Sequence, residues 1–428
     1  MNWILFVEKS IEEWLFLNKE PTPEEVREVG KALGAPSKKK DYVLSRYGDV
    51  FRNLIQKRCV DIEDGLRECI YSWNPRTYIR YFPAALHATG TVLLFKEPGY
   101  IELVSYPIPR AMDLGGHGVS IPSNIPDEIT QRIDGWQINF YYDPILKKWV
   151  PSTKYVLHNM YYEHRKLIIE EFGKIVNPYC STAYRIAETS GLLNKFKGYE
   201  GWTFTFVLKG PEPAITKPIP PDPENYEEYE LYLIMARRPD GRLLSTKESG
   251  ELLNYSTIPE IDIISMEELI SKYSKSVNVR SVFARFNTDP ETPTIIEIKS
   301  QIYPEAMNVK YFSDPKSLLI LASEGLSQVG VNLIYKGLQS YAERIVKAYE
   351  HIEKLITLNL NKPELDKAFI KMELRKFLGE LRSARKKNNP KRLVKKLTCS
   401  LAEGKTPQEV AEILENIVKG LKQHLQET

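Results

Sequence analysis

The spacing of apolar and polar residues changes twice along the chain and divides it into three segments. Residues 1–75 show helical spacing, and Thr22-Pro23-Glu24-Glu25 has the order of a helix capping box with proline in the first turn. Residues 76–312 carry short apolar and aromatic runs separated by Gly, Pro, Asn and Asp, which is typical of antiparallel strands. Residues 313–428 return to helical spacing. The pattern predicts an α+β fold with a helical N-terminal segment, a middle domain of antiparallel sheets and an all-helical C-terminal domain.

Several runs in the middle segment have the length and the aromatic and β-branched content of strands. They are TVLLF (91–95), YIELVSY (100–106), WQINFYY (136–142), WTFTFVL (202–208), YELYLIMA (229–236), SVFARF (281–286) and TIIEIK (294–299). In the C-terminal segment the clearest helix begins at Thr406 and has one apolar stripe. The stripe consists of Val410, Ile413, Leu414, Ile417, Leu421 and Leu425. We expect it to pack on neighbouring helices, and a coiled-coil contact with a protein partner is the alternative.

Composition places the chain among globular proteins. Its 428 residues are 42% hydrophobic and 27% charged, which suits two or three folded domains. The formal net charge is only +3, so affinity for nucleic acid would have to come from local basic patches. Cys59, Cys69, Cys180 and Cys399 form no CxxC pair, which argues against a disulfide framework and against a zinc site. Glu8 interrupts the apolar start before a signal peptide or membrane span is complete. These features predict a cytoplasmic protein with no membrane contact and no metal.

One strongly basic segment lies in the C-terminal region. Between Arg375 and Lys396, ten cationic residues occur with a single acid, Glu380. A solvated helix face is one explanation, although such faces usually mix both signs of charge. The alternative is sequence-independent contact with the phosphate backbone of a nucleic acid. The candidate contacts are Arg385, Lys386, Lys387, Lys391, Arg392, Lys395 and Lys396.

A second cluster mixes aromatic and basic residues in the middle segment. Its members are His158, Tyr161, Tyr162, His164, Arg165 and Lys166. Aromatic rings beside cations can stack on nucleic-acid bases. A partly buried helix face is the alternative, and it is the favoured interpretation.

Five segments of the middle region follow one another in an informative order. They are YPIPRAMDLGG (106–116), RIDGWQINFYYD (132–143), WVPSTKY (149–155), GWTFTF (201–206) and IIEIKSQIY (295–303). In this order they resemble the bacteriophage-type RNA ligases. That family shows a Pro-Phe-x-Lys-Phe-Phe-Asn-Leu-Gly-Glu segment, then Lys-x-Asp-Gly leading into a strand, and then a Thr/Ser-Lys/Arg-Gly step. A Thr-Phe-Glu-Phe strand and a Lys-x-Lys-Ser/Thr-x-x-Tyr element follow.

The resemblance implies a nucleotidyltransferase domain of the ligase type over residues 76–312, followed by an all-helical domain. In that family the lysine of Lys-x-Asp-Gly attacks the α-phosphate of ATP, and this chain has Arg132 at that position. A guanidinium stays protonated, with a pKa above about 12, and offers no free lone pair. Arg132 can therefore hold a phosphate but cannot form the covalent adenylate.

Two further positions depart from the family pattern. Thr205 stands in place of the glutamate of Thr-Phe-Glu-Phe, so a metal or ribose contact is expected to be missing. Glu297 stands in place of the first lysine of Lys-x-Lys, which puts an anion where a cation would face the triphosphate. The matching positions are Asp134, Gly135, Lys154 and Lys299. The resemblance implies that these residues and Arg132 line a nucleotide- and phosphate-binding cleft.

Three functions remain open at this point. The favoured one is an RNA-ligase-like protein without lysine adenylation and without a required cofactor, which binds RNA or a ribonucleoprotein through the cleft and the basic helices. The second is an active ATP-dependent RNA ligase that uses ATP and Mg²⁺, with a displaced nucleophile at Lys96, Lys147, Lys148 or Lys154. The third is a scaffold or assembly protein whose C-terminal helices bind a protein partner.

Overall fold

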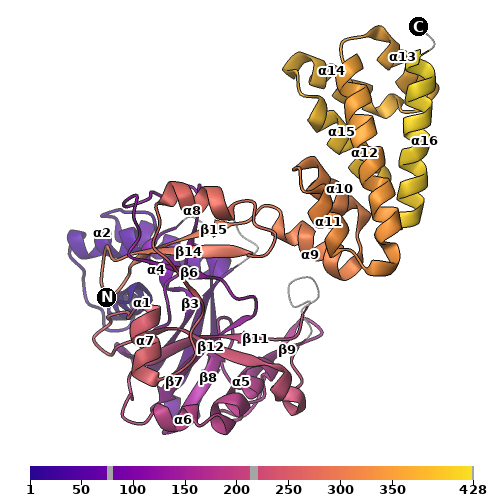
Figure 1. The fold of residues 1–428 in the computed structure, drawn as a ribbon. Coiled ribbons are helices and arrows are strands. Elements are labelled where there is room, and N and C mark those ends of the chain that lie inside the picture. Colours follow the sequence, from indigo (N-terminus) through magenta and orange to yellow (C-terminus); the bar gives the residue numbers. More distant parts are fainter. Residues whose placement is uncertain (75–80, 213–219, 427–428) are drawn as a thin grey trace. The chain divides into compact units, whose positions relative to one another are not determined.

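The computed structural model describes residues 1–74, 81–212 and 220–426 (Figure 1). Contacts between residues divide the chain into two compact units. The first comprises residues 1–274 and 279–299, and the second comprises residues 275–278 and 300–428. The boundaries predicted at residues 75 and 312 stay predictions. Across the described ranges, no helix combines the length and the apolar character needed to cross a membrane.

The first unit begins with helices α1 (Trp3–Leu15), α2 (Pro23–Ala32) and α3 (Lys40–Asp49). The predicted capping box at the start of α2 is confirmed, because Thr22 and Glu25 bond each other's backbone amides reciprocally. The apolar faces of these helices pack into one core with the short helix α4 (Pro83–His87) and one face of the first sheet. That core holds the helical segment on the sheet.

The helical interpretation of residues 1–75 is wrong beyond residue 54. Ile55–Asp61 and Arg67–Trp73 are strands β1 and β2, and they pair antiparallel with β3 (Thr89–Glu97) and β4 (Tyr100–Ser105) in the order β1-β2-β3-β4. Side chains of β2 and β3 enter separate apolar clusters on the two faces of this sheet. A strand buried on both faces lacks the clean alternation that identifies a half-buried strand in a sequence.

Two larger sheets form the rest of the first unit. One has the order β12-β11-β7-β8 and the other has the order β13-β6-β14-β15-β5. Their strands are β5 (Met112–Asp113), β6 (Glu128–Gln131), β7 (Trp136–Asp143), β8 (Lys148–Thr153), β11 (Thr203–Lys209), β12 (Glu230–Arg237), β13 (Glu260–Ile261), β14 (Ser281–Phe286) and β15 (Thr294–Lys299). All pairings are antiparallel except that of β5 with β15. Every predicted strand run falls on an observed strand, and the α+β fold class is confirmed.

Helices and one hairpin complete the first unit. The helices are α5 (Pro178–Thr189), α6 (Leu192–Lys195), α7 (Thr246–Leu253) and α8 (Met266–Tyr273). Strands β9 (Met160–Glu163) and β10 (Lys166–Ile169) form a separate two-stranded sheet. The aromatic and basic cluster around Tyr162 therefore lies on a β-hairpin, and its interpretation as a helix face is wrong. His164 and Arg165, both in the left-handed region, form the turn. The pairing of the two strands could not be predicted from helical spacing in the sequence.

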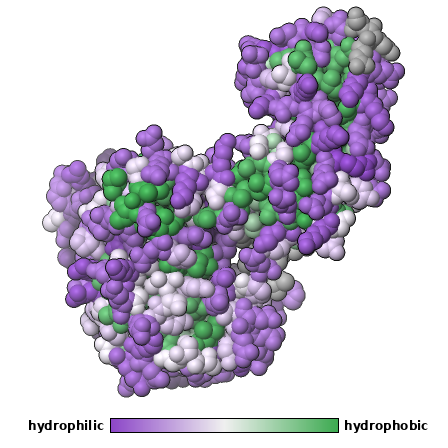
Figure 2. Space-filling view, viewed as in Figure 1, coloured by the Kyte–Doolittle hydropathy of each residue, from purple (hydrophilic) through white to green (hydrophobic). Residues whose placement is uncertain are grey.

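The second unit is built of helices, as predicted for the C-terminal region. They are α9 (Tyr303–Phe312), α10 (Pro315–Ser323), α11 (Ser327–Leu333), α12 (Gln339–Asn359), α13 (Pro363–Lys371), α14 (Leu378–Lys387), α15 (Pro390–Ala402) and α16 (Pro407–Gln426). The stripe of α16 packs on α12 and α13, with Val410, Leu414 and Leu421 fully buried, so its prediction as a core contact is confirmed. The face of this unit seen in Figure 2 is largely hydrophilic.

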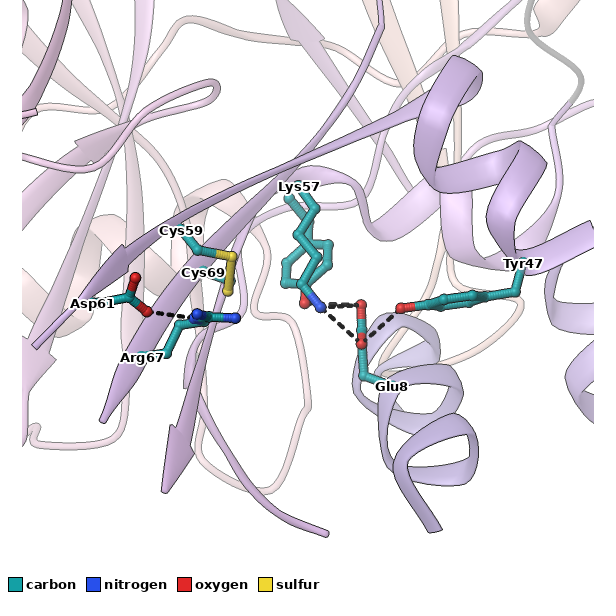
Figure 3. The surroundings of a disulfide bond; sticks show 8 residues. Glu8, Tyr47, Lys57, Cys59, Asp61, Arg67 and Cys69 are labelled. Carbon is teal, nitrogen blue, oxygen red and sulfur yellow. Dashed lines mark hydrogen bonds and ion pairs between the residues drawn. A yellow bond between two sulfur atoms is a disulfide. The ribbon is translucent and has the colours of Figure 1, made fainter. Parts of the chain in front are cut away.

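A disulfide corrects the expectation from the cysteine spacing. Cys59 of β1 and Cys69 of β2 are paired in register, and their sulfur atoms are bonded (Figure 3). Directly opposite residues of an antiparallel pair have Cβ atoms about 4.5–5.5 Å apart, so a small adjustment brings the sulfurs into contact. The bond depends on strand register, which the spacing of ten residues did not show.

A buried carboxylate joins α1 to the first sheet near this disulfide (Figure 3). Glu8 of α1 is 1% exposed. Both of its oxygens lie 3.0 Å from Nζ of Lys57 on β1, and the Tyr47 and Tyr71 hydroxyls donate to it at 3.1 and 2.9 Å. Such a group is tolerated only because its charge is paired and its lone pairs are satisfied.

Removing the cation from this group is expected to destabilise the fold. In a Lys57→Met variant, Glu8 stays buried without a counter-charge, which should lower the free energy of unfolding by about 3 kcal/mol in urea denaturation. The control is Glu8→Gln combined with Lys57→Met, which removes both charges and should recover most of the loss. A single variant as stable as the natural protein would contradict the structural role of the pair.

Candidate functional site

The turn containing Arg132 connects two sheets. It leaves β6 in one sheet and enters β7 in the other, and the Arg132 amide donates to the Ser281 carbonyl at 3.0 Å. Gly135 ends the turn against β11, where an added Cβ would lie 2.2 Å from the Leu208 carbonyl oxygen. A glycine is needed here because the backbones approach too closely for a side chain. Gly135 is therefore required for the backbone geometry of the turn.

Arg132, at the end of β6, and Glu297, on β15 of the same sheet, form an ion pair. Nη1 of Arg132 lies 2.8 Å from Oε1 of Glu297, and the Ser281 hydroxyl donates to the same oxygen at 2.6 Å. Glu297 is 7% exposed. The charge of Glu297 is therefore matched by the arginine that occupies the other altered position.

The surroundings of Glu297 keep it ionised. Burial by itself raises the pKa of this carboxyl, but Arg132, the Ser281 hydroxyl and Lys299 more than offset that effect, and the pKa lies below its ordinary value. Nζ of Lys299 lies 3.5 Å from Glu297 and 2.5 Å from Asp113, the residue paired with Glu297 in the parallel strand β5. Lys299 therefore lies beside the Arg132–Glu297 pair and is engaged by two carboxylates.

Asp134 is also engaged, by a residue that the sequence analysis did not select. Nη1 of Arg280, just before β14, lies 2.5 Å from Oδ1 of Asp134. The Arg132 turn is therefore tied to β14 and β15 by two ion pairs. The position of Arg280 just before the strand that pairs with β15 could have identified it as a site residue. Its partner Asp134 lies 146 residues away in the sequence, so the ion pair itself could not be predicted from local spacing.

Lys154 lies at the same end of the sheet because β7 and β8 form a hairpin. Ile138 near the start of β7 pairs with Thr153 at the end of β8, and Lys154 follows directly. Nζ of Lys154 lies 4.7 Å from the centroid of the Trp73 ring. Burial, and then the nearby charges of Arg110 and Arg132, lower the pKa of the Lys154 amine to about 7.

Arg110 is the second cation over Trp73, and the sequence analysis missed it as a site residue. Its guanidinium carbon lies 3.7 Å from the centroid of the Trp73 ring and 4.8 Å from that of Tyr81. Burial lowers the pKa of Arg110. Its Nη1 is buried and has no hydrogen-bond partner in the part of the chain that the structure describes. A buried donor left without a partner costs free energy, so this nitrogen points to an acceptor supplied by a ligand.

Thr205 belongs to the fold and not to the charged site. It is 1% exposed, its hydroxyl lies 3.2 Å from Oδ1 of Asn139, and it accepts from the Ile108 amide at 3.4 Å. These bonds join β7 and β11 to the segment before Arg110. A neutral hydroxyl suits this position because no cation is needed to balance it.

Three of the candidate substitute nucleophiles lie away from the site. Lys147 and Lys148 occupy the far end of the β7–β8 hairpin, roughly 17 Å or more from the Ile138–Thr153 pair at about 3.3 Å per residue. Lys96 lies near the far end of β3 and pairs with Glu102 at 2.5 Å. Of the four lysines considered, only Lys154 faces the Arg132 turn.

The candidate nucleic-acid contacts of the C-terminal unit fall into two groups. Ion pairs engage four of them, Arg385 with Asp366, Lys391 with Glu353, Lys395 with Glu324 and Lys396 with Glu380. Lys386 and Lys387 on α14 and Arg392 on α15 are exposed, and no ion pair is recorded for them within residues 300–426. These three remain available for phosphate contact.

Chemically, the site offers two unengaged cations on an aromatic surface. Across residues 1–74, 81–212 and 220–426, no group of three or more His, Cys, Asp and Glu side chains could hold a metal ion. Arg110 and Lys154 suit an anion, while Trp73, Tyr81 and Tyr155 provide apolar ring faces beside them.

Comparisons with known proteins do not assign a family. No model of a protein family matches the sequence, and no curated protein matches it. Among solved structures, two archaeal ATP-dependent RNA ligase structures are similar at TM-scores of 0.37 and 0.39 and 13% identity, covering 70% of this chain and 68% of theirs. A Naegleria gruberi RNA ligase with PPi is similar at a TM-score of 0.29 and 10% identity, covering 59% of this chain and 97% of its own.

The Arg132–Glu297 pair can be tested by a double-mutant cycle. We expect Arg132→Gln, Glu297→Gln and the double variant to give a coupling free energy of about 1–2 kcal/mol at pH 7 in urea unfolding. Because the pKa of Glu297 is lowered, the contribution is present above the ordinary glutamate pKa of about 4.3 and is lost as pH falls through the lower folded value. Additive single variants at pH 7 would show that the two charges do not interact.

Proposed function

We propose that this chain is an RNA-ligase-like protein that binds phosphate groups of RNA, free or within a ribonucleoprotein, without adenylation of residue 132. One observation carries the proposal. Arg110 and Lys154 both lie against the Trp73 ring without a recorded ion pair to an acid in the described residues, whereas carboxylates engage Arg132, Arg280 and Lys299. Two unpaired cations facing one ring match a phosphate flanked by a base.

The order of the five sequence segments supports RNA as the partner, because it resembles the RNA-ligase pattern on both sides of the site. Phosphate contacts are sequence-independent and come from local basic groups, which fits a chain with a formal net charge of only +3. In the helical unit, Lys386, Lys387 and Arg392 would add backbone contacts.

The proposed absence of adenylation at residue 132 follows from the chemistry of arginine. A covalent adenylate needs a nitrogen with a free lone pair, which a protonated guanidinium does not offer. Arg132 is also held by Glu297 at 2.8 Å, so its donors are directed to a carboxylate of the protein. Both features favour binding over covalent catalysis at this position.

Lys154 supports a second candidate function. Its pKa of about 7 leaves a large neutral fraction at physiological pH, and a neutral amine is a nucleophile. If ATP and Mg²⁺ bind in the site, attack of the Lys154 nitrogen on the α-phosphate would form a P–N bond, release pyrophosphate and give a proton to solvent. This alternative differs from the main proposal in leaving one AMP on the protein.

Intact-mass measurement separates the two candidates. After incubation with ATP and Mg²⁺ or Mn²⁺ from pH 6 to pH 9, the main proposal expects an unchanged mass. Addition of one AMP that disappears in Lys154→Arg would establish the second candidate. Lys154→Arg keeps a cation in place but removes the neutral amine, so it is the matched control for the chemistry.

RNA binding tests the main proposal. In fluorescence anisotropy with a labelled single-stranded oligonucleotide, Arg110→Gln or Lys154→Gln should weaken binding about ten- to hundredfold, because each removes a charged hydrogen bond of about 1.5–3 kcal/mol. Each change should also reduce the salt slope by about 0.7. Lys96→Gln, at a lysine outside the site, is the control. Failure of the natural protein to bind RNA at low salt would reject the proposal and favour the scaffold function.

A further inference from the structure

The turn of the β9–β10 hairpin has a backbone conformation that is unfavourable for the residues that form it. His164 and Arg165 form its two-residue turn with φ of 46° and 67°. A turn with positive φ at both central residues normally uses Asn-Gly, because other side chains are strained in the left-handed region. Both turn residues here have nitrogen-containing side chains, and both are exposed. Strain retained at an exposed position points to a use for the side chains.

The base of the hairpin is held rigidly by side-chain hydrogen bonds. Asn159 Nδ2 donates to the Glu170 carbonyl and Asn177 Nδ2 donates to the Met160 carbonyl, both at 2.8 Å. Met160 is fully buried, while Tyr162 further along β9 is 50% exposed. The hairpin therefore presents its outer half to solvent from a fixed base.

A series of contacts joins the hairpin to the candidate site. Nζ of Lys154 lies 5.5 Å from the centroid of the Tyr155 ring, and Arg58 donates to the Tyr155 carbonyl at 3.0 Å. The guanidinium carbon of Arg58 in turn lies 5.7 Å from the centroid of the Tyr162 ring. All of these residues belong to the first unit, so their spacing is set by one fold.

The charges at the tip are available to a partner. Arg165 and Lys166 are exposed, and no ion pair is recorded for either among the described residues. Glu163, which lies opposite Lys166 in register, is the acid at this end of the hairpin. An exposed ring beside unpaired cations fits a strand whose bases are free to stack and whose phosphates pair with the cations.

We propose that the β9–β10 hairpin is a binding arm for single-stranded RNA, with a base stacked on Tyr162 and phosphates on Arg58, Arg165 and Lys166. In this proposal the bound RNA extends from Arg110 and Lys154 to the arm. The arm proposal therefore rests on the proposed function. Duplex RNA fits the arm less well, because paired bases do not expose a face to Tyr162.

The experiment compares variants of the arm in the full chain, by anisotropy with labelled single-stranded and duplex RNA. Tyr162→Leu keeps an apolar side chain but removes the ring and should weaken single-strand binding about five- to hundredfold, whereas Tyr162→Phe keeps the ring and should bind as the natural protein does. Arg165→Gln with Lys166→Gln should weaken binding and lower the salt slope by about 1.4, two phosphates at about 0.7 each. Glu163→Gln should strengthen it.

A turn variant separates function from folding. His164→Asn with Arg165→Gly installs the preferred turn and should raise the melting temperature while weakening RNA binding. Lys39→Gln with Lys247→Gln is the charge-matched control, since both lysines are exposed outside the hairpin and the candidate site, and α7, which carries Lys247, lies on the side of the first unit away from β9 in Figure 1.

The outcomes distinguish the arm from the site. If Arg110→Gln and Lys154→Gln weaken binding but the arm variants do not, the arm proposal is overturned and the proposed function stands. If the arm variants weaken binding of duplex and single strand equally, the stacking assignment is overturned. If the natural protein binds no RNA, both proposals fail.

Discussion

The charged site depends on one contact, the ion pair between Arg132 and Glu297. The Arg132 side chain comes from the turn after β6 and the Glu297 side chain from β15 of the same sheet, so the 2.8 Å contact fixes the turn against β15. A buried carboxylate requires a counter-charge, and here the residue that supplies it is the one that stands at the expected nucleophile position. As a result Glu297 stays ionised, Lys299 is drawn towards it and the turn carrying Asp134 is held near Arg280.

This pairing changes the meaning of the two departures from the RNA-ligase pattern. Taken separately, each weakens a phosphate site, because one removes the nucleophile and the other introduces an anion. Together they form a neutral pair, and either change alone would leave a charge without its partner in a largely buried position. Arg110 and Lys154 have no recorded ion pair in the described residues, and it is at these two cations that we propose an anionic ligand binds.

The sequence predicted the strands with clear aromatic and β-branched runs, and it placed Arg132, Glu297, Lys154 and Lys299 in one region. It did not predict β1 and β2, because that sheet is buried on both faces and shows no clean alternation. Contacts between residues that are distant in the sequence could not be predicted for a related reason. Nothing in the proline-rich sequence around Arg110 indicates its contact with Trp73 at the end of β2. The contact between Cys59 and Cys69 likewise depends on the register of the β1–β2 pair. Local patterns specify elements, whereas side-chain partners depend on how those elements are packed.

A crystal structure of the protein with a short single-stranded RNA would test most directly whether the site binds phosphate while Arg132 stays engaged. We expect a phosphate within hydrogen-bond distance of the Arg110 guanidinium and the Lys154 amine, with the Arg132–Glu297 contact unchanged. A phosphate bound to Arg132 with Glu297 displaced, or RNA bound only elsewhere on the protein, would contradict the assignment.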